Sequence, residues 1–217
     1  MSAPNPANFD RLARFYRALE FLAFGRDLER ARFCFLPELA GCRSILVLGE
    51  GDGRCLARLV RLAPEARIDC IDLSPAMLAR AGRRLEGTGG AERVRFIQGD
   101  ALARPVPEAR YDAVVTFFFL DCFTTPEVET IARRISAGLL PGARWLFADF
   151  VLPPRGWRRC RARVWVAVLY AFFHWETRLS TRSLPASEAA LAAEGWRPER
   201  IRDFQQGLVR SAIFRRG

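Results

Sequence analysis

The sequence predicts a doubly wound α/β fold, in which a mostly parallel sheet has helices on both faces. An apolar run at residues 45–48 ends in three glycines at alternate positions, and residues 55–62 then have the composition of a helix. Four further strand-like segments (67–71, 94–97, 111–116 and 144–147) follow in alternation with helical segments, which is typical of parallel sheets. The 217 residues, half of them apolar, are enough for one such domain.

The three glycines, Gly49, Gly51 and Gly53, directly follow the first predicted strand. Glycine adopts positive φ without a steric penalty and lets a ligand approach where a Cβ would otherwise stand. The next helix points its unpaired N–H groups at the same place. We therefore expect a nucleotide-type cofactor site here; a tight turn without a ligand is the alternative.

The glycine spacing excludes two common nucleotide motifs. The dinucleotide fingerprint needs a glycine at its sixth position, which is Arg54 when counted from Gly49 and Leu56 when counted from Gly51. The phosphate-binding P-loop needs a lysine, and the chain contains none. The cofactor is therefore of another kind.

Two carboxylates in the turn, Glu50 and Asp52, would repel a pyrophosphate and favour a ligand with a cationic part. S-adenosylmethionine has such a part, because it carries a sulfonium and an ammonium group. The pattern Gly49-x-Gly51-x-Gly53 resembles motif I of the class I S-adenosylmethionine-dependent methyltransferases.

Acidic residues at the ends of the next two predicted strands extend this resemblance. Asp72 lies about 20 residues beyond the glycine turn, where an acidic side chain accepts hydrogen bonds from ribose hydroxyls. Residues 72–81 are similar to the family's second motif. Asp100 follows the strand at 94–97, where the family places an acidic residue against the adenine amino group.

The resemblance, carried by residues 44–150, implies a Rossmann-like sheet of seven mostly parallel strands, the last two at about 200–204 and 208–214. It also implies S-adenosylmethionine as methyl donor and S-adenosylhomocysteine as product. The positions that it assigns to cofactor binding are Gly49, Glu50, Gly51, Gly53, Asp72, Leu73, Met77, Asp100, Ala101 and Phe117.

The two ends of the chain resemble the ubiquinone/menaquinone-biosynthesis C-methyltransferase group. This weaker resemblance is carried by residues 9–25 and by a pattern that runs from Leu184-Pro185 to residues 207–209. Arg17 departs from the group, which tends to have an acidic residue there, and the loop at 117–123 is more aromatic than expected. These departures bear on the quinone acceptor and not on the cofactor.

We expect a single methyltransferase domain over residues 1–217, since no linker or repeat divides the chain. Its expected parts are an N-terminal helical cap (1–43), a cofactor-binding core (44–150), a substrate-side insertion or lid (151–198) and a final strand pair (199–217).

The net charge is +10, and the positively charged side chains are all arginines. Such a charge suits a polyanionic partner such as RNA, DNA or an anionic membrane surface. Nucleic acid is the less favoured partner. Many methyltransferases of base amino groups have an Asn/Asp-Pro-Pro-aromatic motif after the fourth strand, and residues 116–119 lack it. The oligomeric state is not indicated.

The compartment is predicted from the cysteines and the first residues. The six cysteines are scattered without a C-x-x-C pair, which indicates reduced thiols and neither a disulfide framework nor a metal site. The first ten residues have no apolar signal core. We expect a cytoplasmic protein, with peripheral contact at the inner face of the membrane as an open alternative.

A basic stretch at 158–163 leads into an apolar stretch at 164–175. The apolar part is too short to span a bilayer, which takes about 20 residues. Two interpretations remain open. The segment is a buried helix or lid packed by its own aromatics, or its aromatics line an apolar pocket or enter a membrane interface beside arginine–head-group contacts.

The predicted function is methyl transfer to a small lipophilic acceptor, quinone- or lipid-like, because aromatic residues at 117–123 and 15–24 would flank the methyl group. His174, Tyr16 and Asp121 are the candidate catalytic bases, which are needed only if the acceptor loses a proton. The alternatives are an RNA or protein methyltransferase, or a protein that binds the cofactor without transferase activity.

Overall fold

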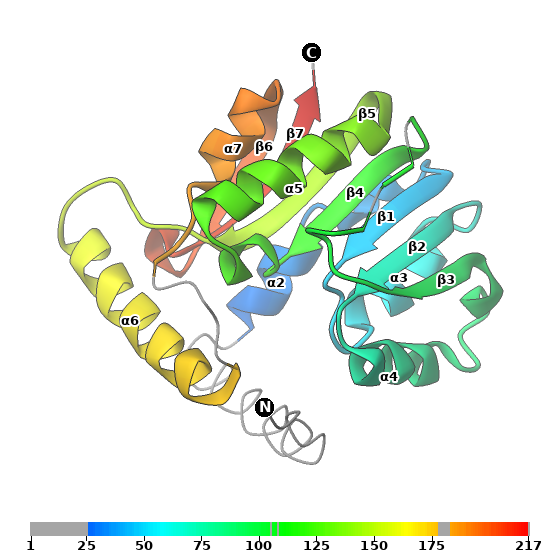
Figure 1. The fold of residues 1–217 in the computed structure, drawn as a ribbon, viewed down its shortest axis with the longest axis horizontal. Helices are drawn as coiled ribbons and strands as arrows, with labels where there is room; N and C mark the ends of the chain where they lie inside the picture. The colour runs from blue at the N-terminus through cyan, green and yellow to red at the C-terminus, as the bar shows by residue number, and fades with distance from the viewer. Residues whose placement is uncertain (1–25, 105, 108, 178–182, 217) are drawn as a thin grey trace.

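The computed structural model describes residues 26–216 except 105, 108 and 178–182, and between 168 and 177 it describes the backbone alone. Seven strands form one sheet in the order β3-β2-β1-β4-β5-β7-β6, as Figure 1 shows. The strands are β1 (Ser44–Leu48), β2 (Arg67–Asp72), β3 (Val94–Gln98), β4 (Tyr111–Phe117), β5 (Leu139–Phe150), β6 (Trp196–Phe204) and β7 (Val209–Arg216).

The first five strands are parallel, and β7 runs antiparallel to both β5 and β6. The predicted doubly wound, seven-stranded, mostly parallel sheet is therefore confirmed. Since β1 lies between β2 and β4, the strand order reverses there. In open α/β sheets ligands bind at the carboxyl ends of the strands beside such a reversal.

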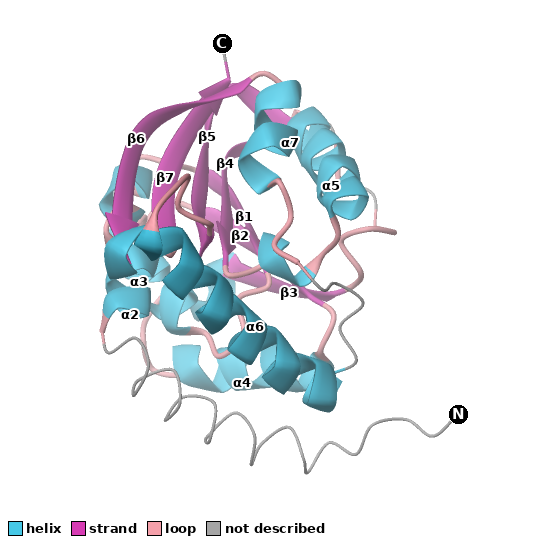
Figure 2. Ribbon diagram, turned by 90° about the vertical axis from the view of Figure 1, so that its left-hand side faces the viewer, coloured by secondary structure: helices cyan, strands magenta, loops and turns pink. Residues whose placement is uncertain are grey.

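Helices cover both faces of the sheet (Figures 1 and 2). Neighbouring residues of one strand belong to different apolar clusters: Val115 packs in the cluster with α3 and α4, and Val114 in the cluster with α5 and α7. Burial on both faces explains why these strands are continuous apolar runs. The helices are α2 (Asp27–Phe33), α3 (Arg54–Leu62), α4 (Pro75–Leu85), α5 (Thr125–Gly138), α6 (Trp157–Thr177) and α7 (Ser187–Ala193).

Local signals start two of these helices. At α4 the Ser74 hydroxyl accepts a hydrogen bond from the Met77 N–H at 3.3 Å, and Pro75 occupies the first turn. At α5 the Glu127 carboxylate accepts from the Thr124 N–H at 2.8 Å, within a capping box. These caps set the direction in which each helix leaves the carboxyl edge of the sheet.

Two strands begin earlier than the sequence predicts. β5 begins at Leu139, which pairs with Tyr111 before a register shift. β6 begins at Trp196, whose buried indole N–H donates to the Ser136 hydroxyl at 2.8 Å. Both extensions depend on pairing with distant residues, which a local pattern does not contain.

α6 lies beyond the carboxyl ends of the parallel strands and outside the body of the sheet (Figures 1 and 2). It contacts the remainder of the protein through Ala162, which is fully buried in a small apolar cluster with Leu28 and Leu208. Its role as a lid stays a prediction. No helix among the described residues is both long enough and apolar enough to cross a membrane.

Candidate functional site

The glycine turn begins where β1 ends, beside the reversal of strand order. Gly49, Gly51 and Gly53 all have positive φ, at +64°, +69° and +84°. The Gly49 N–H donates to the Ile71 carbonyl at 3.0 Å, which joins the turn to the end of β2. The predicted conformational reason for glycine at these positions is confirmed.

The space around each glycine differs. A Cβ at Gly49 would overlap the Phe119 ring, and a Cβ at Gly53 would lie 2.7 Å from the Ala81 Cα of α4. At Gly51, by contrast, no atom lies within 4 Å of the position that a Cβ would take. Gly49 and Gly53 are therefore required by the protein's own packing, whereas the open space at Gly51 fits the approach of a cofactor.

The two carboxylates of the turn, Glu50 and Asp52, have partners inside the protein. Glu50 Oε1 accepts from the N–H groups of Cys55 and Leu56 at 2.8 and 3.2 Å and so caps α3. Asp52 accepts from the Arg54 side chain at 3.0 Å and pairs also with an arginine of α4. Both carboxylates thus have partners among the protein's own residues, and a cofactor contact of Glu50 stays a prediction.

Burial raises the pKa of Glu50 to about 7 from an ordinary value of 4.5. The stability that this group contributes is therefore fully present below pH 4.5 and is lost as the pH rises through 7. The loss amounts to about 3 kcal/mol of unfolding free energy. We predict that Glu50→Gln removes it, so that the variant gains stability relative to the wild type between pH 4.5 and 7 in urea titrations.

Glu127→Gln is the matched control, since Glu127 also accepts an N–H at a helix N-terminus. Hydrogen bonds from Thr124 lower the pKa of Glu127, so its contribution is present above the ordinary pKa and is lost as the pH falls. Glu127→Gln should thus lose stability relative to the wild type as the pH rises. Parallel pH profiles for the two variants would contradict the burial of Glu50.

Asp72 ends β2 beside the turn. Its Oδ2 lies 3.5 Å from the Gly51 N, and its Oδ1 accepts from the Ser74 N–H at 2.8 Å. Burial raises the pKa of Asp72 above its ordinary value. The next residue, Leu73, is 70% exposed, which leaves an apolar surface free beside the carboxylate.

Asp100 is held next to Asp72 by the pairing of β2 with β3. The Gly99 N–H donates to the Asp72 carbonyl at 3.1 Å. The exposed Asp100 carboxylate accepts from the Leu102 N–H at 2.8 Å, which closes a turn around Ala101. The structure thus brings Gly51, Asp72 and Asp100 to one edge of the sheet, as the sequence predicts.

An aromatic turn, residues 117–123, follows β4 on the other side of the glycines. Phe118 has φ of +51°, which is uncommon for a bulky residue, and its N–H donates to the Ala148 carbonyl at 2.7 Å. Its ring meets Phe150 edge-to-face at 5.3 Å. Phe119 meets Phe123 at 5.1 Å and covers Gly49. The cofactor turn and the aromatic turn therefore touch.

Two carboxyl groups meet where the aromatic turn packs against the end of β5. Asp149, at the end of β5 and only 1% exposed, accepts the Asp121 N–H at 3.1 Å and the Phe150 N–H at 3.0 Å. Burial raises the pKa of Asp121 to about 6, while burial and the charge of Asp121 raise the pKa of Asp149 well above its ordinary value. A hydrogen bond links the two side chains. Ionisation of the second carboxyl group of the pair is therefore disfavoured while the first is charged.

The structure describes the three predicted bases in different detail. Asp121 lies in the aromatic turn, His174 lies in α6 where the backbone alone is described, and Tyr16 lies outside the described residues. The sequence did not single out Asp149, although an acidic residue at the end of an apolar strand is an indication of function. No cluster of metal-ligating side chains occurs among the described residues.

Comparison with known proteins agrees with this geometry. Residues 45–142 match the family described as a methyltransferase domain. The chain is 35% identical over 150 residues to the demethylmenaquinone methyltransferase of Thermus thermophilus, a match that covers 68% of this chain and 66% of the relative. The chain belongs to the class I S-adenosylmethionine-dependent methyltransferases.

The similarity to quinone methyltransferases is distant. This methyltransferase is 29% identical over 150 residues to the ubiquinone/menaquinone biosynthesis C-methyltransferase of Paracoccus denitrificans, which covers 67% of this chain and 58% of the relative. The matched part of the chain thus spans less than two thirds of the length of each of these two relatives.

Solved structures share the fold. The S-adenosylhomocysteine-bound methyltransferase CalO1 of calicheamicin biosynthesis has a TM-score of 0.67 at 22% identity, over 94% of this methyltransferase and 57% of that chain. The N-methyltransferase NodS of Bradyrhizobium japonicum has a TM-score of 0.60 at 18% identity, over 88% of this methyltransferase and 97% of that chain.

Proposed function

We propose that this methyltransferase transfers a methyl group from S-adenosylmethionine to a small lipophilic acceptor, quinone- or lipid-like. The observation that carries the proposal is the aromatic turn at 117–123, which touches the cofactor turn and contributes Asp121 to a carboxyl pair with Asp149 of β5. The distant similarity to proteins named as quinone methyltransferases supports the same class of acceptor.

The donor fits the residues at the carboxyl edge of the sheet. The open space at Gly51 admits a ligand to the backbone, and the carboxylates of Asp72 and Asp100 accept hydrogen bonds from hydroxyl and amino groups. The exposed Leu73 offers an apolar contact beside them. The bound donor supplies a methyl group that its sulfonium has already activated.

The aromatic turn would hold the acceptor. The rings of Phe118, Phe119 and Phe123 exclude water and offer flat apolar surfaces to an acceptor ring. The Arg32 guanidinium lies over the Phe118 ring at 4.8 Å, and its charge offsets part of the rise that burial causes in the pKa of Asp121. Holding the acceptor at contact distance from the methyl group supplies much of the acceleration of such reactions.

Asp121 is the base that we propose. With its pKa near 6 it is ionised at neutral pH, and its backbone N–H donates to the Asp149 carboxyl group at 3.1 Å, which holds it in place. A carboxylate with this pKa is suited to accept a proton from an acceptor hydroxyl near pH 7. His174 and Tyr16 remain alternative candidates.

Incubation with methyl-labelled S-adenosylmethionine and fractionated cell extract tests the proposal. We predict that label enters the organic-soluble fraction and that Asp72→Ala abolishes this transfer, because the variant lacks the carboxylate beside Gly51. Label in RNA or in protein would overturn the choice of acceptor. Binding of the donor without transfer to any fraction would overturn the proposed activity.

A further inference from the structure

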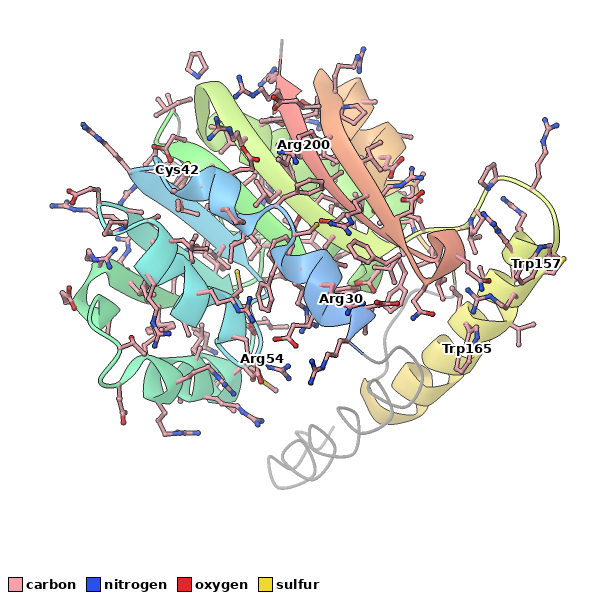
Figure 3. All side chains as sticks on the ribbon, turned by 180° about the vertical axis from the view of Figure 1, so that it is seen from behind. Arg30, Cys42, Arg54, Trp157, Trp165 and Arg200 are labelled. Carbon is pink, nitrogen blue, oxygen red and sulfur yellow. The ribbon has the colours of Figure 1, made fainter. Side chains whose placement is uncertain are left out.

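The first turns of α6 present an apolar stripe to solvent. Trp157 and Val164 are each 64% exposed, and Cys160 and Ala167 are exposed on the same side. Positions i, i+3, i+7 and i+10 share one helix face. Figure 3 shows Trp157 at the outer end of α6, with Trp165 further along the helix.

The opposite side of the helix is attached to the protein. Ala162 is buried, and Trp165 and Val166 pack against an apolar cluster that includes Leu28 and Phe150. The exposed stripe is therefore the second apolar face of a docked helix, whereas a helix on the surface of a soluble domain normally has only one.

Positive charge surrounds the stripe. Arg155, Arg158 and Arg163 are exposed, and no carboxylate of the described residues forms an ion pair with them. The sequence contains no acidic residue from 150 to 175. A cationic helix with an exposed tryptophan and apolar stripe has the composition of helices that lie in a membrane interface.

The docked side of α6 is connected to the proposed acceptor site through the apolar cluster that it packs against. Phe150, in the cluster that holds α6, meets the ring of Phe118 in the aromatic turn at 5.3 Å. A lipophilic acceptor that is dissolved in a bilayer would thus enter near the surface to which α6 is bound.

We propose that the outward face of α6 binds the surface of an anionic phospholipid membrane. Trp157 and Val164 enter the interfacial region, and Arg155, Arg158 and Arg163 contact lipid phosphates. This proposal rests on the proposed function, because the membrane would be the source of the lipophilic acceptor. Charge complementarity favours anionic over neutral lipids, since each arginine near an anionic membrane surface strengthens binding about fivefold.

Sedimentation with vesicles tests the proposal on the full chain. We expect the wild type to bind vesicles of phosphatidylcholine mixed with phosphatidylglycerol far more tightly than vesicles of phosphatidylcholine alone. The triple variant Arg155→Gln/Arg158→Gln/Arg163→Gln should bind the mixed vesicles roughly 100-fold more weakly. The variant Trp157→Ser/Val164→Ser should also bind them more weakly.

Arg61→Gln/Arg67→Gln/Arg83→Gln is the matched control, since these three arginines are exposed elsewhere and the net charge changes equally. Equal loss of binding in the control and α6 triple variants would overturn the proposal. Absence of wild-type vesicle binding would overturn it too, as would self-association or RNA binding through the same residues without vesicle binding.

Calorimetry with S-adenosylmethionine on every variant separates the two proposals. An α6 variant that binds the donor normally is folded, and its vesicle result then bears on α6 alone. A wild type that binds vesicles and not the donor would contradict the proposed function and leave membrane binding in place.

Discussion

Gly51→Ala should lower the affinity for S-adenosylmethionine about 10- to 100-fold while the protein stays folded. No protein atom lies within 4 Å of the position that the new Cβ would take, so the methyl group displaces nothing in the protein. It would instead occupy the space that we assign to the ligand. Isothermal calorimetry measures the effect directly.

The substitution also lowers the stability of the folded protein, because of the backbone conformation at this position. Gly51 has φ of +69°, and an alanine in this left-handed region costs about 1–2 kcal/mol. Gly142→Ala is the matched control, because Gly142 has φ of +76°, has open space at its Cβ position and lies near the amino end of β5, at the opposite edge of the sheet from the glycine turn.

Both alanine variants should lose similar stability in urea titrations, and only Gly51→Ala should lose affinity for the donor. Equal donor affinities in the two variants would show that the space at Gly51 is not the cofactor site. Gly53→Ala would not be informative, because its Cβ would meet the backbone of α4 and disturb the packing itself.

The parts of the site that lie in one local pattern are predictable from the sequence. A strand that ends in glycines or in an acidic residue can be recognised from the sequence alone. Parallel pairing of β2 with β3 then brings Asp72 and Asp100 to the same edge of the sheet. The caps at Ser74 and Thr124 are equally local. These features depend on residues a few positions apart, so no knowledge of the topology is needed.

Contacts between distant segments are not predictable in this way. The Asp121–Asp149 pair joins residues 28 positions apart, and it exists because β4 and β5 are neighbours in the sheet. The helix-capping role of Glu50 was missed for a different reason. The sequence shows that a carboxylate lies in the turn, but only the geometry shows that it faces the N-terminus of α3.

The carboxyl pair makes the second large prediction, that Asp121→Asn lowers the turnover number about 100-fold or more. The amide keeps the size of the side chain and removes the group that accepts the proton. With the wild type, turnover should rise as the pH increases through about 6, where Asp121 ionises. The variant should lose this dependence, which a pH–rate profile on the labelled acceptor would show.

Asp149→Asn distinguishes catalysis from mere burial of charge. Burial and the charge of Asp121 raise the pKa of Asp149 well above its ordinary value, so the charged form is disfavoured and a neutral amide is a close substitute. The amide oxygen keeps one of the two backbone N–H bonds that Asp149 accepts. Turnover at pH 7 should therefore be largely retained in this variant, with the rise near pH 6 still present. Turnover lost equally in both variants would instead assign the pair a structural role.

Asp112→Asn provides the matched control for loss of a structural carboxylate. Asp112 accepts the N–H groups of Arg43 and Ser44 at 2.7 and 3.1 Å at the amino end of β4, remote from the aromatic turn. This variant should lose stability and keep turnover. Asp121→Asn should instead gain stability above pH 6 and lose turnover. It removes a carboxyl group whose raised pKa makes the wild type less stable as the pH rises. Opposite signs in stability and in turnover would thus identify Asp121 as a group retained for the reaction at the expense of the fold.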